Sequence, residues 1–306
     1  MFDYEYWGMQ DLNIGSNMAL EEYLLDRSIR ENKATVRFWN VAKDAVVLGY
    51  GESEGSVKRL DGSFDLARRI TGGSHIQFDS NCLAYSFTVP RDGSFRHFDD
   101  MRKYYAGKIA DAFQELGIDV SAVDNRASTI NVDDKVVASH AIFWGVKSAL
   151  LHGLMIIKDY DVDRILERVA LNERRIGRHI YTEYSALKNI PPLEKLLDSR
   201  INATDRSMKT AMAKRMITNE VLKQVTEGRY EKRELSKGIV EDAAKMIIKT
   251  HVGSPWVSDR NPAFGKEQAE AIPGEELDGA LKNGLGYCLY SQVKDRDFEK
   301  MAEPSE

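Results

Sequence analysis

Residues 67–87 read ARRITGGSHIQFDSNCLAYSF, and they place two arginines shortly before a pair of glycines. Glycine allows a positive φ angle and lets another group approach the backbone closely, because it has no Cβ atom. Successive backbone N–H groups in such a loop can form an anion-binding concavity, and the arginine fork fits phosphate or carboxylate oxygens. Taken alone, the stretch is better explained by a tight β-turn flanked by surface charge, and a phosphate cradle is the alternative that other segments of the chain must support. The cradle would consist of Arg68, Arg69, Thr71, Gly72 and Gly73.

The alternating apolar residues after the glycines predict a strand-rich fold. In residues 82–90 every second residue from Leu83 to Val89 is large and apolar, which is typical of a half-buried strand that ends at Pro90. Similar patterns predict strands at 34–40, 44–50 and 149–157, a hairpin at 128–144 that turns near Asp133 and Asp134, and helices at 17–29, with Ser16 as N-cap, and at 99–116. We therefore expect an α+β fold with a mixed β-sheet core flanked by helices.

The composition is that of an ordinary globular protein and excludes several classes. Of the 306 residues, 42% are hydrophobic and 30% are charged, and the net charge of -5 argues against general nucleic-acid binding. No apolar run approaches the roughly 20 residues that a membrane helix needs, and the N-terminal residues do not resemble a signal peptide. Two cysteines, Cys82 and Cys288, are too few for a disulfide scaffold. We expect a cytoplasmic protein without nucleic-acid or membrane partners.

The second half of the chain is more polar. Residues 204–237 carry nine basic and five acidic side chains in a pattern that predicts helix. Such a run is most often the solvated face of a helix, and the alternative is a docking surface for an acidic partner protein. Residues 239–251 predict one more amphipathic helix, so we expect a helical C-terminal extension.

Four segments, in the right order, resemble the lipoate–protein ligase A family of the wider biotin/lipoate ligase superfamily. Residues 67–87 are similar to the family signature Arg-Arg-x-Ser/Thr-Gly-Gly-Gly-Ala-Val-Phe-His-Asp, and NMALEEYLL (17–25) is similar to its Asn-x-Ala-Leu-Glu-Glu helix. VVLGYGES (46–53) stands where the family has an apolar strand ending in Gly-Arg-x-Gln. DDKVVASHAIFWGVKSALLHGLMI (133–156) resembles the family's lysine-containing segment followed by Leu-x-His-Gly-Thr-Leu. Four ordered matches are more specific than any one of them.

The resemblance implies the fold of class II biotin ligases over a catalytic domain at residues 1–238, with residues 239–306 as a small C-terminal extension or partial accessory domain. It also implies that the enzyme uses ATP and Mg²⁺ to convert lipoate or octanoate into an acyl-AMP, and passes the acyl group to a lysine of a lipoyl carrier domain. The implied carriers are acyltransferase subunits of 2-oxo acid dehydrogenases or a glycine cleavage H-type protein. A separate accessory subunit stays an open alternative. We expect no metal site made by the protein alone.

Acyl-adenylate formation brings a carboxylate against the α-phosphate, so a fixed cation beside both groups relieves their repulsion. Lys135 matches the family lysine with this role and is the predicted catalytic residue, although the local sequence also fits an exposed turn lysine. His152 likewise fits either an acyl pocket or the end of a strand. The resemblance implies an ATP site of Arg69, Thr71, Gly72, Gly73, Ser74, His75, Ile76, Gln77 and Lys135. It implies a lipoate site of Lys135, Ser139, His152 and Gly153.

Several residues depart from the family pattern. Ser74 replaces the third glycine, and His75 replaces the alanine that usually follows it. Tyr50 and Glu52 replace arginine and glutamine, and His140 stands where a small residue is usual. Several of these side chains are larger than the usual ones and are expected to narrow the cleft. A substrate other than lipoate, a need for a partner, or loss of activity are therefore alternatives.

Two other functions stay open. An ATP-independent octanoyl or lipoyl transferase would need a cysteine nucleophile with a lowered pKa. Residues 124–132, where relatives of that type carry it, contain no cysteine, and Cys82 fits a packing role at the start of a strand. The second alternative is a degenerate, non-catalytic paralogue that binds lipoyl domains, which the altered Ser74 and His75 favour and the retained Lys135 opposes.

Overall fold

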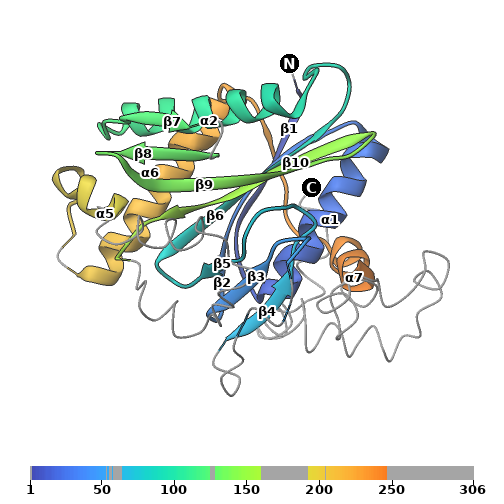
Figure 1. Ribbon diagram of the computed structural model, residues 1–306, viewed down its shortest axis with the longest axis horizontal. Coiled ribbons are helices and arrows are strands. Elements are labelled where there is room, and N and C mark those ends of the chain that lie inside the picture. The colour runs from blue at the N-terminus through green and yellow to red at the C-terminus, as the bar shows by residue number, and fades with distance from the viewer. Residues whose placement is uncertain are drawn as a thin grey trace, which may run out of the picture.

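The fold is centred on an eight-stranded mixed sheet (Figure 1), and the computed structural model describes residues 2–52, 54, 57, 64–124, 128–159, 192–203 and 205–246. Strand β1 runs parallel to its two neighbours, whereas the other pairs are antiparallel. In spatial order the strands are β11 (Glu231–Lys232), β1 (Tyr4–Leu12), β2 (Ala34–Val41), β6 (Cys82–Pro90), β10 (Ser148–Ile156), β9 (Lys135–Trp144), β8 (Thr129–Val132) and β7 (Ala122–Asp124). The predicted mixed sheet with flanking helices is confirmed.

A second, three-stranded sheet carries the glycine-rich segment. Its order is β4 (Asp65–Arg68), β3 (Ala45–Leu48), β5 (Ile76–Phe78), with β3 parallel to β4 and antiparallel to β5. The loop between β4 and β5 therefore crosses over the end of β3, and it contains Gly72 and Gly73. This crossing fixes where the loop lies.

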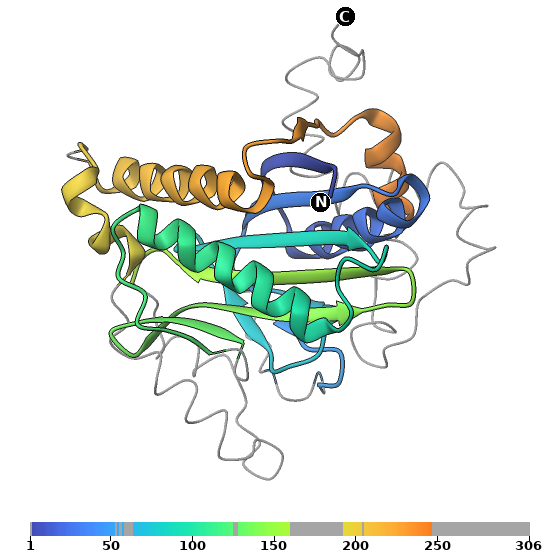
Figure 2. The same cartoon turned by 90° about the horizontal axis from the view of Figure 1, so that it is seen from above.

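Helices cover both faces of the large sheet. Helices α2 (Phe98–Glu115) and α6 (Arg206–Thr226) lie side by side on one face (Figure 2), where their apolar residues join the largest core cluster. Helix α1 (Ile14–Glu31) and the small sheet cover the other face, and α7 (Lys237–Met246) packs on α1. Two short elements, α5 (Leu193–Leu196) and a 3-10 turn (Asp198–Arg200), precede α6. No helix of the described residues is both long and apolar enough to cross a membrane.

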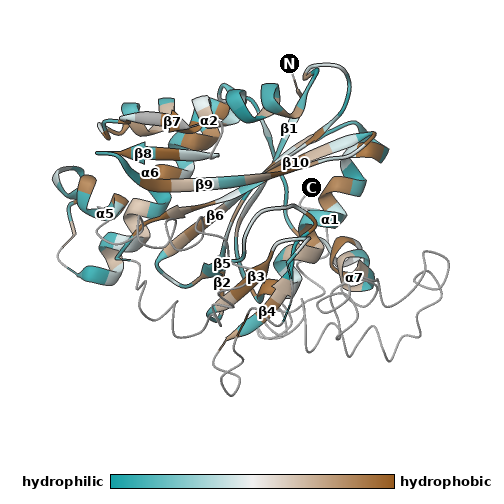
Figure 3. Ribbon diagram, in the orientation of Figure 1, coloured by the Kyte–Doolittle hydropathy of each residue, from teal (hydrophilic) through white to brown (hydrophobic). Residues whose placement is uncertain are grey.

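Strand β6 is buried more deeply than its alternating pattern predicts. All nine of its residues are buried, including Ser86 and Thr88, because α2 covers one face and α1 with the small sheet covers the other. Figure 3 shows hydrophobic colouring over β3 and β6 and hydrophilic segments along α2. The prediction of a half-buried strand was wrong, since the elements that cover its second face are distant in the sequence.

Two local predictions can be compared directly with the structure. Helix α1 begins earlier than expected, because Asn13 rather than Ser16 is its N-cap and accepts a hydrogen bond of 2.8 Å from the Ser16 amide. The hairpin turn at Asp133 and Asp134 is confirmed. Both residues have positive φ angles, 47° and 58°, as a two-residue turn between twisted strands requires.

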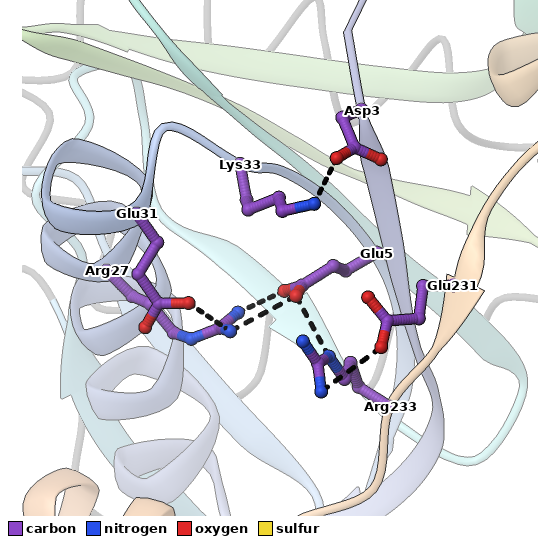
Figure 4. A network of polar contacts seen from close by, with 7 residues as sticks. All are labelled: Asp3, Glu5, Arg27, Glu31, Lys33, Glu231 and Arg233. Carbon is purple, nitrogen blue, oxygen red and sulfur yellow. Dashed lines mark hydrogen bonds and ion pairs between the residues drawn. The ribbon is translucent and has the colours of Figure 1, made fainter.

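The sequence predicted helix throughout the basic segment 204–237. The segment is not one continuous helix, and some of its basic side chains bind residues of other elements. Helix α6 ends at Thr226 and is followed by the short strand β11. Arg233 donates a hydrogen bond to the fully buried Glu5, and Arg27 of α1 donates to the same carboxylate (Figure 4). Lys214 donates to Asn40 and to the Ser80 carbonyl. These two cations hold elements together, so only the remaining charges are candidates for a docking surface.

His140 faces the α2 side of the sheet and not the side of the glycine loop. It pairs across the strands with Gly153, and neither of its ring nitrogens has a hydrogen-bond partner among the described residues. Burial lowers the pKa of His140 to about 4, with a further lowering by the positive charge of Arg102 on α2. The sequence led us to expect that the larger side chain of His140 narrows the cleft beside the loop. This expectation was wrong, because the side chain lies on the other face of the sheet.

We expect His140→Leu to remove a pH dependence of stability. In the unfolded chain the His140 imidazole is protonated near pH 6.5, whereas in the folded protein it is protonated only near pH 4. The free energy of unfolding should therefore fall between pH 6.5 and pH 4, by up to about 1.4 kcal/mol per pH unit from this residue. Urea unfolding at pH 7, 6 and 5 should show a flatter profile for the variant, while His97→Asn, a change at an exposed histidine, should keep the wild-type slope. Equal slopes for His140→Leu and wild type would contradict this account.

Candidate active site

The loop between β4 and β5 exposes its backbone at the two glycines. Gly72 and Gly73 are both exposed, and Gly73 has a φ angle of +91°, which a residue with a side chain rarely adopts. A Cβ atom added at Gly72 would have no atom within 4 Å. The predicted cradle is thus an open stretch of backbone with space in front of it.

Arg69 holds this loop in shape from below. Its Nη2 donates to the carbonyls of Gly72 and Ser74, each at 2.7 Å, and its Nε donates to the Thr71 hydroxyl at 2.9 Å. Its Nη1 donates to the Val47 carbonyl on β3 at 3.2 Å. The guanidinium is buried, which lowers its pKa to about 10, so it stays charged at neutral pH. Arg69 therefore fixes the loop and places a positive charge beneath it.

A buried chain of hydrogen bonds leads from the loop across the large sheet. Thr71 Oγ1 lies 2.7 Å from His152 Nε2, and His152 Nδ1 lies 2.7 Å from Glu21 Oε2. Trp39 Nε1 donates to the other Glu21 oxygen at 3.2 Å. All four side chains are buried. The chain joins β2, β10, α1 and the loop into one polar unit.

The hydrogen-bond pattern assigns a direction to this chain. Arg69 Nε already donates to Thr71 Oγ1, so the Thr71 hydroxyl hydrogen can point at His152 Nε2. The Glu21 carboxylate accepts hydrogen bonds, so His152 Nδ1 carries the hydrogen of the bond between them. This arrangement fixes the orientation of the His152 ring between Thr71 and Glu21.

Residues 49–52, which directly follow β3, form a second contact with the glycine loop. Tyr50 N donates to the Thr71 carbonyl at 2.9 Å, and Arg68 Nη1 donates to the carbonyls of Gly49 and Glu52 at 2.8 and 2.7 Å. A Cβ atom on Gly49 would lie 1.8 Å from the Gly73 carbonyl oxygen, so only glycine fits this close approach. Residues 49–52 and the glycine loop therefore pack as one unit.

Glu52 and His75 meet at the end of this unit. His75 Nδ1 lies 3.0 Å from Glu52 Oε1, and the Gly49 amide donates to Glu52 Oε2 at 2.8 Å. Burial alone would raise the pKa of Glu52, but the bonds from His75 and Gly49 hold it below its usual value. The His75 side chain is only 1% exposed. His75 is thus turned toward Glu52 and buried, and does not stand free as a bulky group in a cleft.

The other predicted ATP-site residues lie on β5. Ile76 is half-buried and packs on the apolar cluster under the small sheet, and Gln77 is buried. The backbones of both pair with β3. Ser74 contributes its carbonyl to Arg69 and is half-buried. The structure therefore brings the predicted residues from Arg69 to Gln77 together around one loop.

The predicted lipoate-site residues divide between the two faces of the sheet. Ser139 pairs with Leu154 on β10, which shares its face with His152. Gly153 points to the opposite face, where a Cβ atom would lie 2.4 Å from the Tyr85 ring. Lys135 begins β9 beside the hairpin turn and pairs with Val132. Its side chain makes no hydrogen bond or ion pair with any residue that the structure describes. Its role stays a prediction.

Three residues of this site were not singled out from the sequence. Glu21 and Trp39 lie in the predicted helix and strand but carry no local sign of a polar role, and Glu52 was noted only as a departure from the family pattern. The histidine and threonine that they support were predicted. The signal that could have identified Glu21 is a carboxylate with apolar residues at helical spacing on both sides, namely Met18, Leu24 and Leu25.

Comparisons with known proteins identify the family and the fold. Residues 13–216 match the family model of the lipoyl protein ligase A/B catalytic domain. The chain is 21% identical over 261 residues to lipoate–protein ligase 1 of Staphylococcus aureus. The aligned region covers 83% of this chain and 73% of that protein.

Two solved structures share the fold. The bi-partite lipoate protein ligase of Thermoplasma acidophilum, studied with its E2 lipoyl domain, has a TM-score of 0.65 at 15% identity and covers 84% of this chain and 96% of that one. A lipoate-protein ligase A bound with ATP has a TM-score of 0.64 at 16% identity and covers 84% and 98%.

Proposed function

The chain belongs to the lipoyl protein ligase A/B catalytic domain family, and from this premise we propose that it activates lipoate or octanoate with ATP and transfers the acyl group to a lysine of a lipoyl carrier domain. The carriers would be acyltransferase subunits of 2-oxo acid dehydrogenases or a glycine cleavage H-type protein. The solved relatives bound to ATP and studied with a lipoyl domain support these partners.

One observation carries the proposal: the buried chain that connects the glycine loop to Glu21 through Thr71 and His152. On the loop side, exposed glycine backbone above a buried arginine suits a phosphate. On the other side the chain ends at Trp39, and an acyl chain would have to lie beside the packed apolar cluster that contains Trp39, Met18 and Leu154. A reaction between a nucleotide phosphate and an acyl carboxylate needs these two environments side by side.

The reaction has two steps. A carboxylate oxygen of lipoate attacks the α-phosphorus of ATP, the bond to the β-phosphate breaks, and pyrophosphate leaves. A neutral lysine amine of the carrier then attacks the acyl carbon, the bond to AMP breaks, and an amide forms with release of a proton. In the first step Lys135 would reduce the repulsion between the carboxylate and the phosphate, and Arg69 would keep the loop backbone in place.

The described residues fit a nucleotide better than they fit a metal ion. The glycine loop offers backbone N–H groups and space, whereas the described part of the chain contains no group of three or more His, Cys, Asp or Glu side chains that could hold a metal. Mg²⁺ commonly binds through substrate phosphates and water with only one or two carboxylates. A magnesium ion would therefore be held mainly by the phosphates of the bound ATP.

Pyrophosphate release tests this proposal. We expect release from ATP that depends on added lipoate or octanoate and not on biotin, followed by acylation of one lysine on a purified lipoyl domain, read by mass spectrometry. Acyl transfer from an acyl-carrier protein without ATP would indicate the transferase instead. A protein that binds lipoyl domains but releases no pyrophosphate would be the non-catalytic paralogue.

The transferase alternative gives a separate prediction for Cys82. This residue is 2% exposed, and burial together with the nearby Asp79 carboxylate raises its pKa well above the usual value. A nucleophilic cysteine needs the opposite, a lowered pKa and access to substrate. We expect Cys82→Ser to keep acyl-adenylate formation within about threefold of wild type. An acyl thioester trapped on Cys82 would contradict this; Cys288 lies outside the described residues.

A further inference from the structure

Glu52 and His75 join the segment after β3 to the end of the glycine loop. His75 Nδ1 and the Gly49 amide are bonded to the two oxygens of Glu52, at 3.0 and 2.8 Å. The Glu52 side chain is 17% exposed and the His75 side chain 1%. A carboxylate is thus held at the edge of a loop whose open backbone suits an anion.

The backbone around this pair leaves Glu52 little freedom to move away. Its carbonyl accepts from Arg68, and the Tyr50 amide beside it donates to Thr71. Gly49 lies against the Gly73 carbonyl so closely that no Cβ atom would fit. Any change at Glu52 is therefore transmitted to the glycine loop.

We infer that Glu52 and His75 are a matched positioning pair, in which Glu52 orients the loop and His75 keeps the Glu52 carboxylate away from the loop's anion-binding amides. His75→Ala removes the side-chain donor but leaves the negative charge of Glu52, which the backbone amides of Gly49 and residue 75 still hold beside the loop. A carboxylate that loses one donor can turn toward other N–H groups. Gly72 and Gly73 of the same loop are exposed, and Gly73 closely approaches Gly49, whose amide binds Glu52. Without His75, Glu52 would compete with a bound phosphate for the same amides. The inference rests on the proposed function, because the phosphate is that of ATP.

The two departures from the family pattern at these positions are then one coupled change. In the family signature that residues 46–53 and 67–87 resemble, glutamine and alanine stand where this chain has Glu52 and His75. A neutral amide carries no negative charge that would repel phosphate, and its oxygen can keep the bond from the Gly49 amide, so alanine can stand opposite it. A charged Glu52 needs His75. We therefore expect that restoring the alanine alone weakens ATP binding more than restoring both the alanine and the glutamine.

A double-mutant cycle tests this. We expect His75→Ala to weaken binding of ATP, measured by calorimetry without the acid substrate, by about tenfold or more. Adding Glu52→Gln to His75→Ala should restore ATP binding to within about threefold of wild type. The loss should appear in KM for ATP more than in kcat. If His75 had a purely structural role, the loss would follow the change in melting temperature, and we expect that it does not.

Glu115→Gln supplies the control, because it removes one exposed carboxylate on α2 and should leave ATP binding unchanged. Additive effects of the two substitutions, or wild-type ATP binding by His75→Ala, would overturn the inference while the proposed function stands. Wild-type protein that binds no ATP would overturn both.

Discussion

Lys135→Ala is expected to reduce acyl-adenylate formation by about 100-fold or more, the usual size of losing a fixed charge that stabilises a transition state. The residue begins β9 directly after the hairpin turn, and its side chain is half-buried. No hydrogen bond or ion pair connects that side chain to another described residue, so its removal should leave the melting temperature nearly unchanged. The measurement is lipoate-dependent pyrophosphate release, with thermal unfolding alongside.

A matched lysine controls for the loss of one positive charge. Lys147 lies in the turn between β9 and β10 and is exposed. We expect Lys147→Ala to keep wild-type activity, whereas Lys135→Ala loses it. If Lys135→Ala forms acyl-adenylate at a rate close to that of wild type, the assignment of the catalytic lysine is wrong and the exposed-turn interpretation is correct.

Gly73→Val is expected to have the second-largest effect, on nucleotide binding. The φ angle of +91° disfavours a branched side chain, and a Cβ atom would lie 3.1 Å from Arg69 Nη2, which holds the loop. The loop should change shape, and each charge-assisted hydrogen bond to phosphate that is lost costs about 1.5–3 kcal/mol. We expect ATP to bind at least tenfold more weakly in calorimetry.

Two further glycine variants separate strain from loss of the site. Gly228, after α6, has a φ angle of +75° with no atom near its Cβ position, so Gly228→Val should cost similar stability and leave ATP binding intact. Gly72→Ala meets no atom in the free protein and should leave stability intact, so weaker ATP binding there would report a close ligand. Normal ATP binding by both Gly72→Ala and Gly73→Val would show that the loop is only a turn.

Short-range patterns predicted most of the elements, and long-range packing explains the errors. The hairpin at Asp133 and Asp134 depends on a two-residue turn and adjacent strands, and it was predicted correctly. Strand β6 was predicted as half-buried because its own alternation does not reveal a second covering layer. The N-cap of α1 was placed at Ser16 instead of Asn13, since both residue types cap helices and only the path of the chain after β1 decides between them.

The site shows the same division. The glycine loop could be predicted because its arginines and glycines are neighbours in the sequence. The link from His152 to Glu21 joins residues 131 positions apart, and that from His152 to Thr71 joins residues 81 apart. The pairing of Glu52 with His75 likewise needs β3 to lie between β4 and β5. No local pattern shows which buried polar residues meet after folding.

Transfer of labelled oxygen tests the proposed reaction most directly. Lipoate labelled with ¹⁸O in its carboxyl group would be incubated with ATP, the wild-type protein and a lipoyl domain, and the nucleotide products analysed by mass spectrometry. Because the carboxylate oxygen attacks the α-phosphorus and the acyl carbon–oxygen bond later breaks, we predict AMP that carries ¹⁸O, together with unlabelled pyrophosphate and an acylated carrier lysine. Label in inorganic phosphate with ADP as product, or an acylated carrier with unlabelled AMP or none, would contradict the proposed mechanism.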